Sequence, residues 1–135
     1  MSSVLVAIVL MAHALVHWSL TAVPLPTEKM HTPFWPGPGR AAVDPTWLLM
    51  RAGASPETAR WLGVILMGAA SLGFVLAGLG LLGVPGLYAA WRMLAGGAAL
   101  VSLLMFALYW HPWLVVGAGL NGLILAALIL GTFSA

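Results

Sequence analysis

The chain has 135 residues, of which 62% are hydrophobic and only 6% are charged, whereas soluble domains carry about a quarter charged residues. Its net charge of +2 includes no cluster of Lys and Arg that could follow a phosphate backbone, so we expect no nucleic-acid partner. The absence of cysteine excludes disulfides, thiolate metal sites and thiol nucleophiles. The composition therefore predicts a single all-α domain, residues 1–135, embedded in a lipid bilayer.

Four stretches are long and apolar enough to cross a membrane, which takes about 20 mostly apolar residues per helix. They are residues 4–23, 61–83, 87–110 and 113–133. The last three are joined by very short links, which force neighbouring helices to run antiparallel. The fold class that follows is an integral membrane four-helix bundle. The first stretch lacks the basic start of a signal peptide, so we expect it to be retained; cleavage near Thr21 is the alternative.

One long polar loop, residues 24–60, separates the first two spans. Its first half is rich in Pro, Gly and aromatic residues and is expected to be irregular. Asp44 and Pro45 then give a helix start signal, and Gly53 a stop, which predicts a short helix on the membrane surface. Ser55 begins a second start signal, so the helix of the second span is expected to begin there, before it enters hydrocarbon.

Basic residues are concentrated in the long loop, and only Arg92 lies near the opposite face. Lys and Arg are enriched in cytoplasmic loops of membrane proteins. The long loop is therefore predicted to be cytoplasmic in a multi-pass protein. Arg92 is expected to extend its side chain to the membrane surface, with lipid-headgroup or partner binding as the alternative. The loop residues counted are Lys29, Arg40, Arg51 and Arg60.

Each predicted span places one polar residue near the middle of the membrane. At about 1.5 Å per residue, His13, Ser71, Ser102 and Asn121 all fall roughly 12 to 17 Å below the long-loop side. Polar groups at that depth need partners, so we expect several of them to meet in an interhelical hydrogen-bonded cluster. The cluster is either structural or part of a ligand-binding or proton-relay site led by His13 and Asn121.

His13 and His17 are spaced four residues apart and therefore project from one face of the first span. Such a pair can bind a metal ion if His31 or His111, which lie on the same side as His17, completes the ligand set. No carboxylate lies within a span, which leaves haem b, copper or zinc as the candidate cofactors. The other interpretations are hydrogen-bonded structural histidines and direct contact with an organic ligand such as a quinone.

Six of the seven tryptophans fall on the long-loop side of the predicted bundle. An interfacial aromatic belt explains this distribution. An aromatic-walled vestibule beside the histidines is the alternative, and it would suit a hydrophobic ligand in contact with Trp18, Trp110 and Asn121. The six residues are Trp18, Trp35, Trp47, Trp61, Trp110 and Trp113.

Small residues recur every four positions on three of the spans, and such stripes allow helix backbones to approach closely. The sequence leaves open whether these contacts are internal or bind another subunit. The stripes are Ala69, Gly73 and Ala77; Ala95 and Ala99; and Ala118, Gly122 and Ala126.

Three segments, AHALVH at 12–17, TWLL at 46–49 and GAGLN at 117–121, resemble a group of small four-span bacterial membrane proteins whose first helix carries an A-H-G-x-x-H motif. Ala14 replaces the usual glycine here, and Trp18 replaces the small residue that follows the second histidine. The resemblance implies the fold, a bacterial inner-membrane location and a role for the histidine pair. It implies no mechanism.

The function expected from the sequence is non-enzymatic. It is an accessory or scaffold subunit that binds the bilayer and a partner membrane protein or second copy, or a protein that binds a lipid-like molecule. A haem- or metal-binding redox protein that uses the histidine pair is the alternative. Catalysis is disfavoured because the spans contain no Cys, Asp or Glu. A transporter or channel is disfavoured because no span shows an interrupted helix or an internal carboxylate.

Overall fold

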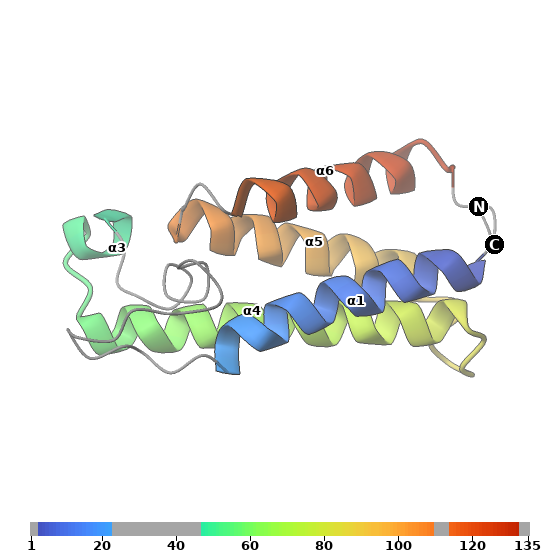
Figure 1. Ribbon diagram of the computed structural model, residues 1–135, viewed down its shortest axis with the longest axis horizontal. Helices are drawn as coiled ribbons and strands as arrows, with labels where there is room; N and C mark the ends of the chain where they lie inside the picture. Colours follow the sequence, from blue (N-terminus) through green and yellow to red (C-terminus); the bar gives the residue numbers. More distant parts are fainter. Residues whose placement is uncertain (1–2, 23–46, 110–113, 133–135) are drawn as a thin grey trace.

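The computed structural model describes residues 3–22, 47–109 and 114–132, which form helices joined by turns, with no strand among them. Four long helices run alternately up and down, and both chain ends lie at the same end of the bundle (Figure 1). A fifth, short helix sits at the opposite end. The helices are α1 (Ser3–Ala22), α3 (Trp47–Arg51), α4 (Pro56–Leu81), α5 (Trp91–Leu108) and α6 (Val115–Ile129).

Helix α1 coincides within one residue with the first predicted span and packs lengthwise against α4 (Figure 1). Its buried positions recur at three- and four-residue intervals, which places them on a single helix face. These positions are Val6, Ala7, Leu10, His13, Ala14 and His17.

The start of α4 confirms the signal in the sequence. The hydroxyl of Ser55 accepts a hydrogen bond from the backbone N–H of Thr58 at 3.1 Å, and Pro56 occupies the first helical position. Glu57 lies in the first turn, where a negative charge is favourable. The short helix α3 also forms where it was expected and ends before Gly53, whose φ is +83°. Asp44 and Pro45 lie outside the described residues.

The third helix begins later than the sequence predicted. The turn after α4 contains two glycines with positive φ, Gly83 and Gly86, as expected. Residues 87–90, however, form further turns, and α5 starts at Trp91. Leu87 lies very close to α4. A Cβ atom added to Gly80 of α4 would lie only 2.7 Å from the carbonyl oxygen of Leu87. The backbone at Leu87 therefore packs directly against α4 before it becomes helical.

Close packing continues along α4 and α5. A Cβ on Gly73 would lie 2.8 Å from the Cβ of Ala98, so only glycine fits there without a shift. Ala77, Ala95 and Ala99 are buried in the same region. The small-residue stripes of α4 and α5 therefore pack inside the bundle. Ala69 of α4 is the exception, because it is exposed.

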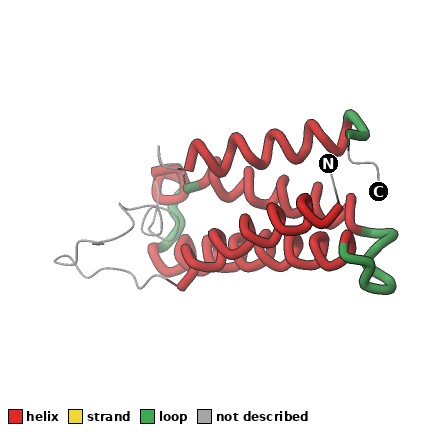
Figure 2. The backbone as a smooth tube through the Cα atoms, turned by 45° about the vertical axis from the view of Figure 1, so that its right-hand side comes forward, coloured by secondary structure: helices red, strands yellow, loops and turns green. Residues whose placement is uncertain are grey.

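Helix α6 is less closely integrated than the other three long helices. It packs mainly against α5 and lies apart from α1 and α4 along one side of the bundle (Figure 2). Only Asn121 and Ile124 of its 15 residues are buried. Gly122 and Ala126, from the predicted stripe of α6, are exposed. The bundle consequently has an open side between α1 and α6.

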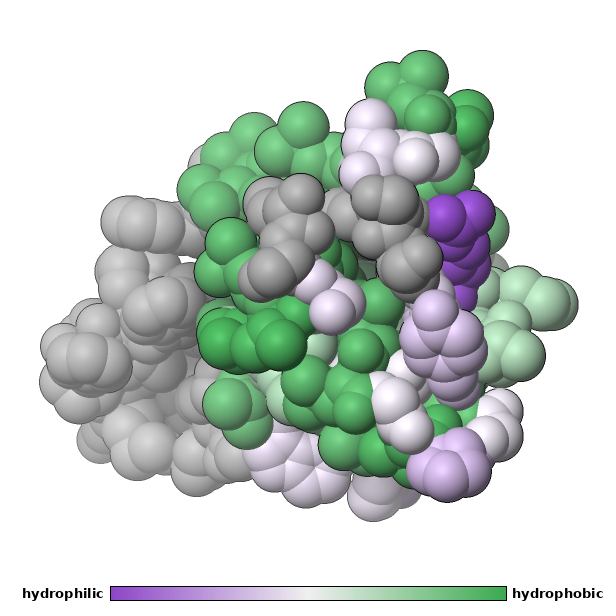
Figure 3. Space-filling model, turned by 90° about the vertical axis from the view of Figure 1, so that its right-hand side faces the viewer, coloured by the Kyte–Doolittle hydropathy of each residue, from purple (hydrophilic) through white to green (hydrophobic). Residues whose placement is uncertain are grey.

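The outer surface of the bundle is more apolar than that of a soluble bundle. Each long helix exposes large apolar side chains, for example Ile8, Leu72, Leu100 and Val116, which are between 57% and 78% exposed. At the end of the bundle that holds the α4–α5 turn, hydrophobic residues are mixed with weakly polar and hydrophilic ones (Figure 3). Among the described residues, α4 and α5 are long and apolar enough to cross a membrane, whereas α1 and α6 are shorter apolar helices.

Candidate functional site

A layer of polar side chains crosses the interior of the bundle. Two hydrophobic clusters flank this layer, one toward each end of the bundle. On α4, for example, Ser71 lies between Met67 of one cluster and Phe74 of the other. Every member of the layer is at most 7% exposed. We call this group the polar layer; it comprises His13, His17, Ser71, Ser102 and Asn121.

Four of these residues form one hydrogen-bonded chain. The Nε2 atom of His13 lies 3.1 Å from the Oδ1 atom of Asn121. The Nδ2 atom of Asn121 donates to the hydroxyl of Ser102 at 2.7 Å. That hydroxyl lies 3.0 Å from the Nε2 atom of His17. The chain links α1, α6 and α5 and confirms that polar residues from different spans meet inside the bundle.

The amide of Asn121 sets the direction of the two hydrogen bonds that it makes. An amide oxygen only accepts, so His13 carries its proton on Nε2 and donates it to Asn121. Ser102 accepts from the amide of Asn121, and its hydroxyl shares a second hydrogen bond with Nε2 of His17. A hydroxyl has one proton and two lone pairs, so it serves His17 as donor or as acceptor according to the tautomer of that histidine.

Ser71, the remaining member of the layer, bonds elsewhere. Its hydroxyl donates to the backbone carbonyl of Ala14 at 2.7 Å, which ties α4 to α1. This bond does not join the four-residue chain. Ser71 therefore lies at the level of the other polar residues, as expected, but its partner is backbone rather than another side chain of the layer.

Aromatic rings surround the two histidines. The imidazole of His17 lies nearly parallel to the rings of Phe74 and Phe106, with centroids 6.1 and 5.6 Å away. His13 meets His17 edge-on at 4.7 Å and Phe74 edge-on at 4.9 Å. These contacts restrain both imidazoles, so the direction of their N–H bonds is fixed by packing as well as by hydrogen bonding.

The arrangement restricts what the layer can do chemically. An amide passes a proton only by changing to its imidic acid form, so Asn121 interrupts proton transfer between the two histidines. Both Nε2 atoms already have partners, and a metal ion bound by the two of them would replace both hydrogen bonds. The geometry of the described residues therefore fits a fixed structural network better than a proton relay along this chain or a metal ion held by both Nε2 atoms.

Several residues of the predicted sites fall outside the described part of the chain. His31, His111 and Trp110 are among them, so the three-histidine metal and haem arrangements stay predictions. Within the described residues no group of three or more His, Asp or Glu side chains is close enough to hold a metal ion. Trp18 is described and is 61% exposed, which places it on the outside of α1.

Arg92 lies where the sequence placed it, next to the turn between α4 and α5, and its side chain is exposed. Its guanidinium carbon lies 5.5 Å from the centroid of the Trp91 ring, within cation–π distance. This position agrees with a side chain at the membrane surface.

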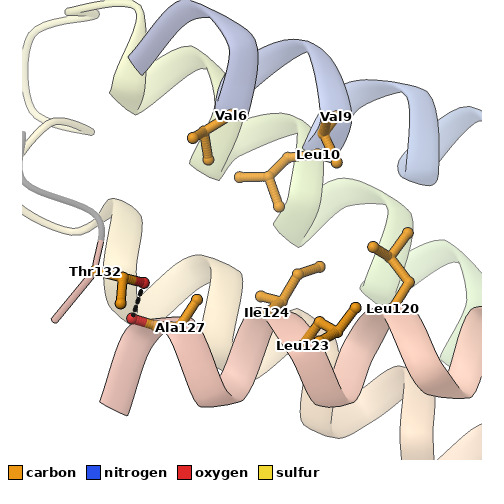
Figure 4. Close-up of a pocket in the computed structure, with 8 residues that line it drawn as sticks. All are labelled: Val6, Val9, Leu10, Leu120, Leu123, Ile124, Ala127 and Thr132. Carbon is orange, nitrogen blue, oxygen red and sulfur yellow. Dashed lines mark hydrogen bonds between the residues drawn. The ribbon is translucent and has the colours of Figure 1, made fainter. Parts of the chain in front are cut away.

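The open side of the bundle holds a groove that the sequence did not indicate. It has a volume of about 340 Å³ and lies between α1 and α6 (Figure 4). Aliphatic side chains of both helices point into it, and Thr132 lies at one end, where its hydroxyl donates to the carbonyl of Ala127 at 3.1 Å. The lining residues are Val6, Val9, Leu10, Leu120, Leu123, Ile124, Ala127 and Thr132.

Comparisons with known proteins found no matching family model, no matching curated protein and no matching solved structure. The resemblance to small four-span bacterial proteins therefore stays a prediction. In its described residues the structure defines an all-helical bundle with a buried polar layer and two helices long and apolar enough to span a membrane.

Proposed function

We propose that the chain is an integral membrane protein whose four long helices all cross the bilayer. The supporting observation is its apolar outer surface, with large apolar side chains exposed on every long helix while a layer of polar side chains is buried. Helix α1 spans 20 residues, close to the length needed. Helix α6 has 15 residues and is extended by the turn at 130–132, so it crosses a locally thinned region or the less deeply embedded edge of the bundle.

We further infer that the protein is a non-enzymatic binder of a lipid-like molecule, which it holds in the groove between α1 and α6. The observation that carries this proposal is the groove itself. Its volume of about 340 Å³ falls within the range of small-molecule sites, roughly 300–1,000 Å³, which are mostly apolar with a few placed polar groups. Seven of its eight lining residues are apolar, and Thr132 is the polar one.

The shape of the site favours a single apolar chain over a helix of another protein. A helix with its side chains is about 10–12 Å wide, too wide for a groove of this volume, whereas one alkyl or isoprenoid chain fits. The hydroxyl of Thr132 lies at the end nearest the chain termini (Figure 4). A ligand with one polar group would therefore place that group at this end and its chain toward Leu120.

A photoreactive fatty acid tests this proposal directly. The probe is added to membranes that contain the protein, and the labelled peptides are identified by mass spectrometry. We expect labelling to concentrate on α1 and α6 residues that line the groove, and Ala127→Phe, which fills the groove, to reduce it about tenfold. The matched control is Ala126→Phe, because Ala126 is exposed and does not line the groove.

Two outcomes would contradict the proposal. One is labelling spread evenly over the lipid-facing sides of all four helices, which is what bulk lipid contact gives. The other is equal labelling of the Ala126→Phe and Ala127→Phe proteins, because the phenyl ring at residue 127 would occupy the space that a bound chain needs.

A further inference from the structure

A basic side chain, Arg92, lies at the same end of the bundle as Thr132, the polar residue of the groove. Helices α5 and α6 run antiparallel (Figure 1), and they are in contact near this end, because a Cβ atom on Gly96 would lie 3.6 Å from Cδ1 of Leu128. One helical turn, about four residues, further toward the chain termini leads from Gly96 to Arg92 and from Leu128 to Thr132. Arg92 and Thr132 therefore lie at about the same level of the bundle.

The position of the Arg92 side chain also connects it to the groove. Its guanidinium carbon lies 5.5 Å from the centroid of the Trp91 ring. Trp91 is 3% exposed and belongs to the same hydrophobic cluster as Val6, Leu10 and Ile124, which line the groove. The positive charge therefore lies against the cluster that also forms the wall of the groove.

The acidic residues of the sequence do not share this end in the described part of the chain. The sequence contains three, Glu28, Asp44 and Glu57, and the first two lie outside the described residues. Glu57 lies in the first turn of α4, at the opposite end of the bundle (Figure 1). Among the described residues, the charged side chain at the polar end of the groove is therefore positive, which favours a negatively charged ligand group there.

We propose, on the basis of the proposed lipid binding, that the ligand of the groove is a single acyl chain ending in an oxyanion, and that Arg92 recognises this oxyanion. A guanidinium presents a planar set of N–H donors that matches two oxygens of a carboxylate or a phosphate. The hydroxyl of Thr132 already donates its proton to the carbonyl of Ala127. Arg92 therefore supplies the donors that an oxyanion needs.

This position also avoids the cost of burying a charge. Arg92 is exposed, so in a membrane its guanidinium and the bound oxyanion both stay at the surface, where water and headgroups solvate them. The acyl chain extends from there along the apolar groove toward Leu120.

The test uses three photoreactive probes that share one acyl chain and differ in headgroup, which is a carboxylate, a phosphate monoester or an uncharged alcohol. Each probe is titrated into nanodiscs that contain the full chain, and labelling of the groove residues is measured by mass spectrometry. Arg92→Gln removes the charge and keeps a similar length. We expect it to lower the labelling ratio of each oxyanion probe to the alcohol probe about fivefold. Because the same ratio is compared between two proteins, differences in partitioning into the bilayer cancel.

Arg51→Gln is the matched control, because Arg51 is also exposed and basic but lies in α3, at the opposite end of the bundle (Figure 1). It should leave every ratio unchanged. Acetate and inorganic phosphate, which carry the charge without the chain, should not compete with the probes. A loss confined to the carboxylate or to the phosphate probe would support the proposal and identify the headgroup.

The assignment of Arg92 is wrong if Arg92→Gln leaves both ratios as they are in the wild type while labelling stays concentrated on the groove. That result would leave the lipid-binding proposal in place. Competition by acetate or inorganic phosphate would show that a free anion binds at Arg92, and it would also overturn the assignment. If none of the three probes labels the groove above the other lipid-facing surfaces, the lipid-binding proposal fails and the assignment of Arg92 fails with it.

Discussion

His13 and Asn121 lie 108 positions apart in the chain, yet the Nε2 atom of one donates to the Oδ1 atom of the other at 3.1 Å. This bond joins α1 to α6, two helices that otherwise make few contacts. Lipid gives apolar helix faces little reason to prefer each other over acyl chains, so polar contacts have a large influence on which helices pair. Asn121 is therefore the main link that holds α6 in position beside the groove.

Asn121→Leu should destabilise the protein. The substitution removes hydrogen bonds to both His13 and Ser102 and leaves those buried groups without partners, which typically costs about 1–3 kcal/mol per group. Unfolding in a detergent mixture of increasing SDS content would measure the change in free energy. Gly119→Ala is the matched control on α6, because its side chain would meet open space and stability should not fall. An Asn121→Leu protein as stable as the wild type would show that packing alone holds α6.

Gly73→Ala should be less stable than Gly68→Ala, although both place the same methyl group on α4. At Gly73 the new Cβ would lie 2.8 Å from the Cβ of Ala98, and overpacking of this kind typically costs about 1–3 kcal/mol. At Gly68 it would meet nothing within 4 Å, so the gain in helix propensity, about 1 kcal/mol, should dominate. Thermal unfolding followed by circular dichroism compares the two. Equal melting temperatures would mean that α4 and α5 can separate without cost.

Tyr109→Phe should lower stability by about 1 kcal/mol. The buried hydroxyl of Tyr109 donates to the backbone carbonyl of Ala59, which fixes the end of α5 to the first turn of α4. The same substitution at Tyr88, the other tyrosine of the chain, is the natural control because that residue is 51% exposed. Both proteins can be compared by SDS-induced unfolding. The prediction fails if the two variants lose the same amount of stability.

Absorption spectroscopy and elemental analysis of the protein purified from native membranes address the haem and metal alternative. We expect no Soret band and no stoichiometric copper or zinc, because the Nε2 atoms of His13 and His17 are both used in the hydrogen-bonded chain. A Soret band that disappears in His17→Leu, or one metal ion per chain, would instead support a redox protein completed by His31 or His111.

The predicted orientation can be tested by cysteine labelling, since the natural chain contains no cysteine to interfere. Ala52 and Leu82 are exposed and lie at opposite ends of the bundle, after α3 and after α4. With the long loop in the cytoplasm, a membrane-impermeant maleimide should label Leu82→Cys in intact spheroplasts and Ala52→Cys only after lysis. The reverse pattern would place the long loop outside, and labelling of both residues from one side would rule out a membrane crossing by α4.

The height of the polar layer followed from the sequence, because the rise per residue of a helix is nearly constant and apolar length sets where a span begins. His13, Ser102 and Asn121 were placed at one depth on that basis, and they bond as expected. His17 was placed nearer the long loop. Its imidazole belongs to the layer because helical side chains tilt toward the helix N-terminus, which brings it back beside His13 and Ser102.

The sequence by itself determined that the chain is helical and apolar, where its second long helix begins, and at which level along the bundle its polar residues lie. Only the tertiary structure decided which side chains became partners and that a groove lies open between α1 and α6. The level of a residue along the bundle depends on the rise of its own helix alone. Which side chains bond to each other depends on how each helix is rotated about its axis and how closely it approaches its neighbour. Contacts between residues distant in sequence, such as Gly73 against Ala98, determine this rotation and this distance.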